Sequence, residues 1–142
     1  MAKVKTLTNW TGLPKDFNPE EFEGFVYLIC NVLTTKSYVG RKYLWARTRK
    51  KIKGRKRKKR CVKESDWRSY KSSSDDLKRD IEKFGVENFT FLILSIHKTR
   101  AQTNYEEVRQ FFLRDVLHSK LPNGEYAYMN GNILGRYFRG KV

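Results

Sequence analysis

The sequence is poor in the residues that bind zinc or form disulfides. Its 142 residues include two cysteines and two histidines. Cys30 and Cys61 lack the C-x-x-C spacing and the histidine partners of a zinc site, and they do not indicate a disulfide framework. His97 and His118 fall at the expected end of a strand and of a helix. We therefore expect neither a zinc centre nor a disulfide, and we assign both histidines structural or solvated positions.

Long apolar runs are also missing. The longest is too short to cross a bilayer, and the chain does not begin with the basic and then apolar residues of a secretory leader. These features predict a cytoplasmic protein without a membrane partner. The length, with 39% hydrophobic and 14% aromatic residues, suits one core. We expect a lead-in over residues 1–23 and one domain over residues 24–142, with a basic insert at 53–63.

Acidic residues are absent from one stretch of the chain. Residues 41–63 contain fourteen lysines or arginines and no acid, whereas the other 119 residues carry seventeen bases and fifteen acids. The net charge of +16 therefore comes almost entirely from this stretch. A run of like charge can be a solvated tail or a sorting signal, but this one lies inside the domain, directly after a predicted hairpin.

Such a patch predicts a polyanionic partner that is held close to the hairpin. An anionic membrane is disfavoured because the stretch has few large apolar side chains to insert. The residues expected to contact this polyanion, which the resemblance described below implies to be DNA, are Arg41, Lys42, Arg49, Lys50, Lys51, Arg55, Lys56, Arg57, Lys58, Lys59 and Arg60.

The hairpin predicted before the basic stretch carries two tyrosines. Residues 24–33 are rich in β-branched and aromatic side chains, residues 34–36 form a polar reversal, and residues 37–40 return as a second strand. Tyr27 and Tyr38 then lie on one hairpin. Two such tyrosines can simply pack against each other, so their meaning depends on the residues that follow.

Two helices are expected after the hairpin. Residues 43–52 carry apolar or β-branched side chains at helical spacing, at Leu44, Thr48 and Ile52. This pattern predicts a helix that ends near Gly54, with residues 55–63 as an exposed loop or a frayed helix end. A second helix is predicted over residues 75–84, with a serine cap before it and Gly85 after it.

The second half of the chain completes the predicted fold. Residues 88–96 form a strand that we expect at the centre of the sheet, because its second half is apolar on both faces. A third helix is predicted from about residues 99–103 to residue 117, with a buried stripe made of Tyr105, Val108, Phe112 and Val116. Together these elements indicate an α/β fold, a small three-stranded, mostly antiparallel sheet flanked by helices.

Several motifs follow one another in a recognisable order. Val26-Tyr27 and Tyr38-Val39-Gly40 lie on the hairpin. Across residues 24–132 there follow a basic helix, a Ser-Ser-capped helix ending in Phe-Gly, a strand of the type Asn-Phe-Thr-Phe-Leu-Ile-Leu, a helix with a glutamate, and a late asparagine. In this order and spacing, the chain resembles the GIY-YIG nuclease family. The form with Trp67, Tyr70, Ser73-Ser74 and Tyr105-x-Glu107 is most similar to small bacteriophage nucleases.

This resemblance implies a GIY-YIG-like fold and a metal-dependent DNA endonuclease that hydrolyses phosphodiester bonds. The bacteriophage-type form implies homing or DNA processing, in the cytoplasm of a bacterial host. The alternative is a catalytically inactive basic protein that binds nucleic acid and has kept the fold. The set Tyr27, Tyr38, Arg47 and Glu107 discriminates between them, because a protein that only binds DNA does not need an acid facing its basic groove.

The resemblance implies that Glu107 is the metal ligand. Phosphodiester hydrolysis needs an activated water and charge neutralisation at the phosphate, and one carboxylate with waters and phosphate oxygens suits Mg²⁺ or Mn²⁺. Glu106 is the alternative carboxylate. However, Thr103-x-x-Glu106 matches a capping box, which gives Glu106 a structural explanation, so Glu107 is preferred.

An arginine for the phosphate and an asparagine that braces the site are also implied. Arg47 is our candidate, because an arginine fork can bind two phosphate oxygens. The usual position of this arginine in the family falls at Thr48, which leaves its other neighbour, Arg49, as the alternative. Asn130 matches the late asparagine, with Asn132 as the alternative.

The tyrosines are the candidates for orienting or deprotonating the attacking water. A free phenol titrates near pH ~10, so a base role for Tyr27 or Tyr38 requires nearby cations that favour the phenolate. Many relatives place a histidine before the second helix, and here that position falls at Ser72. Tyr70 is the nearest group that can replace it.

Overall fold

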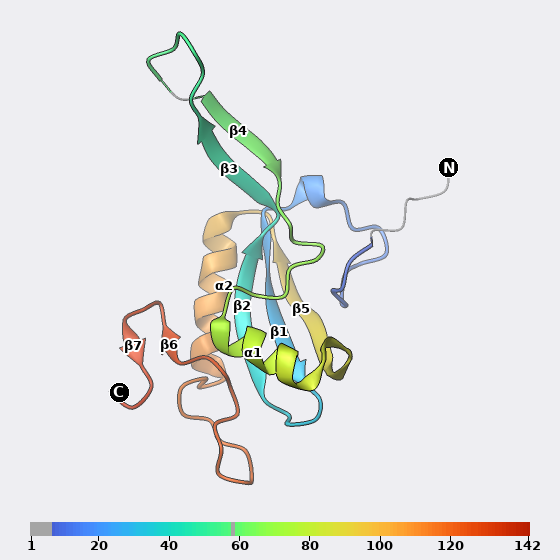
Figure 1. Cartoon of the computed structure of the whole chain (residues 1–142), viewed down its shortest axis with the longest axis vertical. Helices are drawn as coiled ribbons and strands as arrows, with labels where there is room; N and C mark the ends of the chain where they lie inside the picture. The colour runs from blue at the N-terminus through green and yellow to red at the C-terminus, as the bar shows by residue number, and fades with distance from the viewer. Residues whose placement is uncertain (1–6, 58) are drawn as a thin grey trace.

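A three-stranded antiparallel sheet forms the centre of the protein (Figure 1). This computed structural model describes residues 7–57 and 59–142. The strands lie in the order β2 (Ser37–Tyr43), β1 (Gly24–Asn31) and β5 (Phe89–His97), and both pairs are antiparallel. Two helices, α1 (Asp75–Phe84) and α2 (Arg100–Leu113), accompany the sheet. The predicted α/β fold and its tyrosine-bearing hairpin are confirmed.

The central strand is β1, and the prediction that residues 88–96 form it is wrong. Residues 25–27 of β1 are each at most 2% exposed, whereas β5 lies at an edge of the sheet. The lead-in covers this edge: Thr11 N–H donates to the Phe91 carbonyl at 2.8 Å, and Ile93 N–H donates to the Thr11 carbonyl at 2.9 Å. A covering loop can bury an apolar strand as well as a neighbouring strand can, so apolarity alone does not identify the centre.

Two hydrophobic clusters hold the helices against opposite faces of the sheet. Side chains alternate along β1, so odd-numbered residues point to one face and even-numbered residues to the other. The first cluster contains Phe25 and Tyr27 together with Leu77 of α1. The second contains Val26 together with Phe111 of α2. Tyr27 therefore lies on the face that α1 covers.

A β-hairpin replaces the helix predicted over residues 43–52, and that prediction is wrong. β3 (Trp45–Lys50) pairs with β4 (Lys59–Glu64), and the pair projects from one end of the sheet (Figure 1). Residues 55–57 lie in the exposed connection between the two strands, which agrees with the predicted loop, whereas residues 59–63 belong to β4, where the prediction of a loop or a frayed helix end is wrong. The apolar period of residues 43–52 is weak, and long-range pairing between β3 and β4 decides their conformation. We call residues 45–64 the arm.

The helix ends follow local capping chemistry. α1 begins and ends as predicted, because the Ser74 hydroxyl accepts a hydrogen bond from Leu77 N–H and Gly85 takes a φ of 86°. The residue before α2 that caps it is Thr99, whose hydroxyl accepts from Gln102 N–H at 3.1 Å. The capping box that began at Thr103 is therefore wrong.

The buried face of α2 also differs from the prediction. Tyr105 and Phe112, expected in the buried stripe, are 73% and 60% exposed. The residues that face the interior are Thr103, Glu107 and Phe111, spaced four apart. The spacing of apolar residues did not predict the buried face of α2, because two of its three buried residues are polar. Buried polar residues indicate that this face has a role besides packing.

The C-terminal segment folds back along the outer edge of β2, as expected. Met129 N–H donates to the Ser37 carbonyl at 2.7 Å, and Ser37 N–H donates to the Ala127 carbonyl at 2.9 Å. β6 (Asn132–Ile133) and β7 (Tyr137–Phe138) then form a small hairpin. Among the helices of the described residues, none has both the length and the apolar character to cross a membrane.

Candidate active site

Two tyrosines on neighbouring strands form the centre of the candidate site. Tyr27 of β1 and Tyr38 of β2 have ring centroids 6.4 Å apart. Gly40 is the cross-strand partner of Tyr27. A Cβ atom on Gly40 would lie 2.5 Å from Cζ of Tyr27. The tyrosine ring therefore has room against the neighbouring strand because this residue is a glycine.

A third tyrosine and a serine complete this cluster. Tyr70, between β4 and α1, packs against Tyr27 with ring centroids 6.1 Å apart. Ser72, at the position where the resemblance places a histidine, is buried and has a φ of 84°, which is unusual for a residue with a side chain. Burial raises the pKa of Tyr27 well above its ordinary value and also raises that of Tyr38, while the Ser72 hydroxyl opposes both shifts. Tyr27 and Tyr38 are therefore neutral phenols near pH 7.

The inward face of α2 brings Glu107 to this cluster. Its side chain is 8% exposed, and its Oε1 accepts a hydrogen bond from Arg41 Nη1 at 2.6 Å. Burial raises the pKa of Glu107, and the Arg41 guanidinium opposes that shift. Glu106, by contrast, binds Arg109 and Gln110 of its own helix, each at 2.8 Å. The structure thus places Glu107, and not Glu106, beside the tyrosines.

Two adjoining cavities give access to the Glu107 carboxylate. The first, of about 500 Å³, contains all three tyrosines, and the second, of about 350 Å³, lies toward Asn130. Both are lined by Tyr38, Arg41, Ser73 and Glu107. The basic residues around the first cavity are Arg41, Lys42, Arg47 and Arg100. The carboxylate is therefore reached from two sides, one of which is strongly basic.

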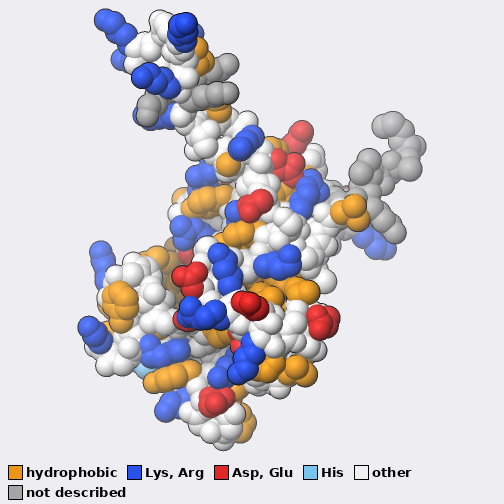
Figure 2. All heavy atoms as spheres, in the orientation of Figure 1, with side chains coloured by type: hydrophobic (Ala, Val, Ile, Leu, Met, Phe, Trp, Pro, Cys, Tyr) orange, Lys and Arg blue, Asp and Glu red, His pale blue; other side chains and the backbone are white. Residues whose placement is uncertain are grey.

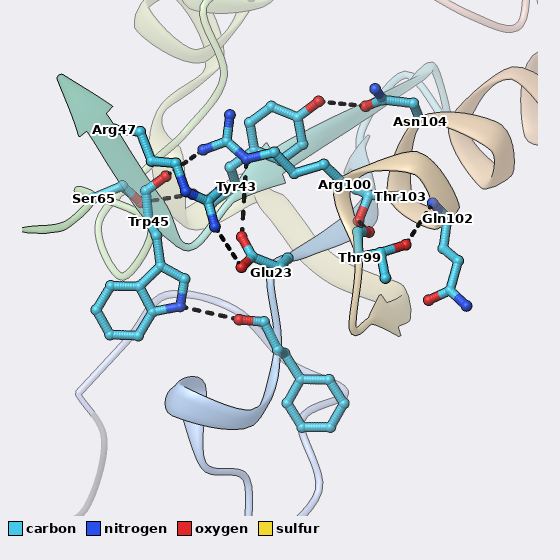
Figure 3. Close-up of polar contacts among 11 residues, drawn as sticks. Glu23, Tyr43, Trp45, Arg47, Ser65, Thr99, Arg100, Gln102, Thr103 and Asn104 are labelled. Carbon is cyan, nitrogen blue, oxygen red and sulfur yellow. Dashed lines mark hydrogen bonds and ion pairs between the residues drawn. The ribbon is translucent and has the colours of Figure 1, made fainter. Parts of the chain in front are cut away.

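Arg47 and Arg100 meet around Glu23 beside the first cavity (Figure 3). Arg47 Nη2 lies 2.6 Å from Glu23 Oε1. Arg100 Nη2 donates to the Trp45 carbonyl at 2.8 Å, and its guanidinium carbon lies 4.2 Å from the centre of the Tyr43 ring. Glu23 Oε2 and Arg100 Nε are 3.8 Å apart, and both are buried without a hydrogen-bond partner in the described structure. Two guanidinium groups thus share one carboxylate.

The structure separates the two arginines that the sequence left as alternatives. Both lie on β3, but only Arg47 lines the first cavity, whereas Arg49 lies farther out on the arm, directly opposite Arg60. Arg100 was missed, because it belongs to no motif. One signal could have found it: Arg100 is the first residue of α2, where the helix dipole favours acids, and the first turn of α2 contains no acid.

Asn130 holds the strand that carries Tyr38. Its side chain is buried, accepts from Val39 N–H at 3.0 Å and donates to the Val39 carbonyl at 2.8 Å. This amide therefore replaces a neighbouring strand at the edge of β2. Asn132, the alternative, is exposed and accepts from Gly135 N–H instead.

The remaining residues expected to contact DNA lie mainly on the arm. Figure 2 shows lysine and arginine side chains over its outer end. Those that the structure describes are all exposed: Arg49, Lys51, Arg55, Lys56, Arg57 and Arg60. Lys58 and the side chains of Lys50 and Lys59 lie outside the described residues. Lys42 lies in the first cavity, with Nζ 2.7 Å from Asp66 Oδ1.

The donor atoms near Glu107 suit one class of metal ion. Within residues 7–57 and 59–142, no group of three or more histidine, cysteine or acidic side chains is placed to hold a metal. His97 and His118 do not line the two cavities. A single carboxylate near phenol and hydroxyl oxygens does not match zinc, but it fits Mg²⁺ or Mn²⁺, which take oxygen ligands and retain waters.

One comparison with known proteins gives a match. A family model described as "Putative endonuclease segE, GIY-YIG domain" matches residues 9–133. The match spans most of the chain and includes every residue of the site described above. Neither the curated proteins nor the solved structures gave a match.

Proposed function

Because the chain belongs to the GIY-YIG nuclease family, we propose that it is a metal-dependent endonuclease that hydrolyses phosphodiester bonds in DNA. One observation carries this proposal: the buried Glu107 shares a cavity with Tyr27, with Tyr38 and with several cations. A protein that only binds DNA gains nothing from such an acid, because a carboxylate repels phosphate.

The cations of the first cavity are proposed to hold the scissile phosphate. Arg41 already compensates the charge of Glu107. Arg47 and Arg100 share one carboxylate, Glu23, and therefore have one positive charge in excess. An arginine fork matches two phosphate oxygens, so this pair supplies charge where it develops during hydrolysis.

Tyr38 is the residue we propose to orient and deprotonate the attacking water. It lines both cavities beside Glu107, whereas Tyr27 is 2% exposed and lies against Gly40. Burial raises the pKa of both phenols and does so more strongly for Tyr27. Tyr38 therefore loses its proton more readily, and Tyr27 positions it. Tyr70 lines the first cavity as well and is the alternative base.

Glu107 is proposed to bind Mg²⁺ or Mn²⁺. Bound there, such an ion would lower the pKa of a water and neutralise charge on the phosphate. The Arg41 guanidinium favours the ionised carboxylate, which is the form a metal requires, against the burial that disfavours it. Asn130 keeps the backbone of the second motif in place, and with it Tyr38.

Supercoiled plasmid tests the proposal directly. The wild-type protein should nick or linearise the plasmid with Mg²⁺ or Mn²⁺ and leave it intact in excess chelator. Binding without cleavage under every metal condition would instead identify an inactive DNA-binding protein. The resemblance to bacteriophage nucleases supports homing or DNA processing in a bacterial cytoplasm as its role. Cleavage at one or a few sites of a long genome would support homing, and unselective degradation would contradict it.

A further inference from the structure

The arm has little to stabilise it within the chain. Its two strands are paired only with each other in the described structure, and an isolated two-stranded hairpin is marginally stable in water. Residues 46–63 contain no acid, so the arm has no counter-charge of its own. An acidic residue, Glu64, appears only at its base. Glu23 pairs with Arg47 near the base, but the described cations farther out on the arm have no ion pair within the described structure, so an external polyanion suits them.

The strand register sorts the side chains of the arm onto two faces. Arg47 lies opposite Val62, and Arg49 lies opposite Arg60, on the same face. The arginine pair is unfavourable, because like charges directly opposite each other destabilise a ladder. Val62 is apolar and yet 62% exposed. We call these four residues the arginine face; Lys63 lies on the other face, opposite Ala46.

The arginine face continues from the candidate active site. Arg47 belongs to this face and also lines the first cavity. A duplex that lies along Arg49, Arg60 and Val62 would therefore approach the cavity at the base of the arm. Figure 1 shows the arm extending away from one end of the sheet, and Figure 2 shows cations over its outer part.

The dimensions of the arm match one feature of duplex DNA. The major groove, about 12 Å wide, admits a two-stranded β-ribbon as it stands, whereas the minor groove, about 6 Å wide, has to be widened or bent to accept one. β3 has six residues, which corresponds to roughly 20 Å of strand at ~3.3 Å per residue. That length spans about six base pairs at ~3.4 Å per step.

We propose that the arm lies in the major groove of duplex DNA and reads base edges within about six base pairs of the cleaved bond. Arg49 and Arg60 donate to guanine O6 and N7, and Val62 contacts thymine methyl groups, the contacts that suit these side chains in the major groove. The inference rests on the proposed nuclease function and deepens it, because it names the groove and the residues that select the site.

Base analogues provide the test. A fragment amplified from plasmid DNA is prepared with guanine, with 7-deazaguanine, which lacks the N7 acceptor of the major groove, or with inosine, which lacks the minor-groove amino group. Binding of wild-type protein is measured in chelator. The 7-deazaguanine duplex should bind about tenfold more weakly, because an arginine contact to guanine then loses its hydrogen bond to N7 and keeps only the one to O6. The inosine duplex should bind like the unmodified one.

Two variants assign the effect to the arginine face. The double variant Arg49→Ala with Arg60→Ala should bind the guanine and 7-deazaguanine duplexes equally. Lys63→Ala removes a charge from the other face and should keep the full discrimination. Unchanged melting temperatures show that both variants are folded.

The other possible results distinguish a wrong groove assignment from a wrong nuclease function. Equal wild-type binding to all three duplexes would overturn the proposal in favour of phosphate contacts alone, and sensitivity to inosine would place the arm in the minor groove. A protein that discriminates 7-deazaguanine but never cuts plasmid would refute the nuclease function and leave the groove assignment standing. One that cuts plasmid without such discrimination would refute the groove assignment alone.

Discussion

Gly40 lies directly opposite Tyr27, and the tyrosine ring occupies the space that a side chain at position 40 would need. A Cβ atom there would lie 2.5 Å from Cζ and 3.0 Å from Cε2 of the ring. Real Cβ contacts are not this short, so the position of the Tyr27 hydroxyl in the site depends on the missing side chain of its neighbour.

Gly40→Ala should therefore displace Tyr27 and remove most cleavage activity. The cost in stability should be about 1–3 kcal/mol, as for other overpacked cores, measured by thermal unfolding, while single-turnover assays measure the cleavage. Gly131→Ala is the stability control, because a Cβ there meets no atom within 4 Å. Wild-type cleavage by Gly40→Ala would show that the position of Tyr27 does not matter to the reaction.

Glu107→Ala should lower the cleavage rate by about a hundredfold or more and leave DNA binding nearly intact. The reason is that a metal ligand contributes to the chemistry more than to docking. Glu106→Ala is the matched control, since this neighbouring acid does not line the two cavities and its hydrogen bonds run to Arg109 and Gln110 of its own helix. Plasmid cleavage and filter binding are measured on the same samples. An inactive Glu106→Ala beside an active Glu107→Ala would reverse the assignment.

Cleavage by the wild type should keep rising with pH above neutrality. Burial raises the pKa of Tyr38, so the phenolate is the minor form at pH 7, and its fraction grows about tenfold per pH unit below that pKa. Single-turnover rates across the alkaline range measure this slope, and Tyr38→Phe should lose both the rate and the slope. A plateau beginning at pH ~6.5 to 7.5 would instead indicate a histidine base, which His97→Ala and His118→Ala would then identify.

Replacing the basic residues 55–60 by neutral ones should flatten the salt dependence of DNA binding. Each duplex phosphate contact that is lost should reduce the slope of log K against log salt by about 0.9. Fluorescence anisotropy over a range of salt concentrations measures the slope. Lys78→Gln with Lys83→Gln, two exposed lysines of α1, should leave it nearly unchanged. If the arm variant keeps the wild-type slope, the run is a solvated segment.

Local patterns in the sequence determined the parts of the protein in which chemistry and structure act over a few residues. Ser74 and Gly85 mark the ends of α1 because capping is local. The apolar runs around a short polar reversal identified the hairpin, and with it Tyr27 and Tyr38. Glu107 was preferred from the resemblance and from a capping box that the structure does not form, whereas the hydrogen bonds of Glu106 run to Arg109 and Gln110 of its own helix.

Only the tertiary structure decided which elements meet. The apolar residues within the stretch 43–63 are too few and too irregular to distinguish a helix from a strand. Pairing between β3 and β4 therefore decided its conformation. The buried face of α2 could not be predicted from the sequence because Thr103 and Glu107 are polar. Their burial depends on packing against the sheet and on Arg41, which lies 66 positions away from Glu107 and binds it. Arg100 likewise lines the first cavity because α2 begins beside β3, where Arg100 donates to the Trp45 carbonyl. Such contacts join residues far apart in sequence, and no local pattern records them.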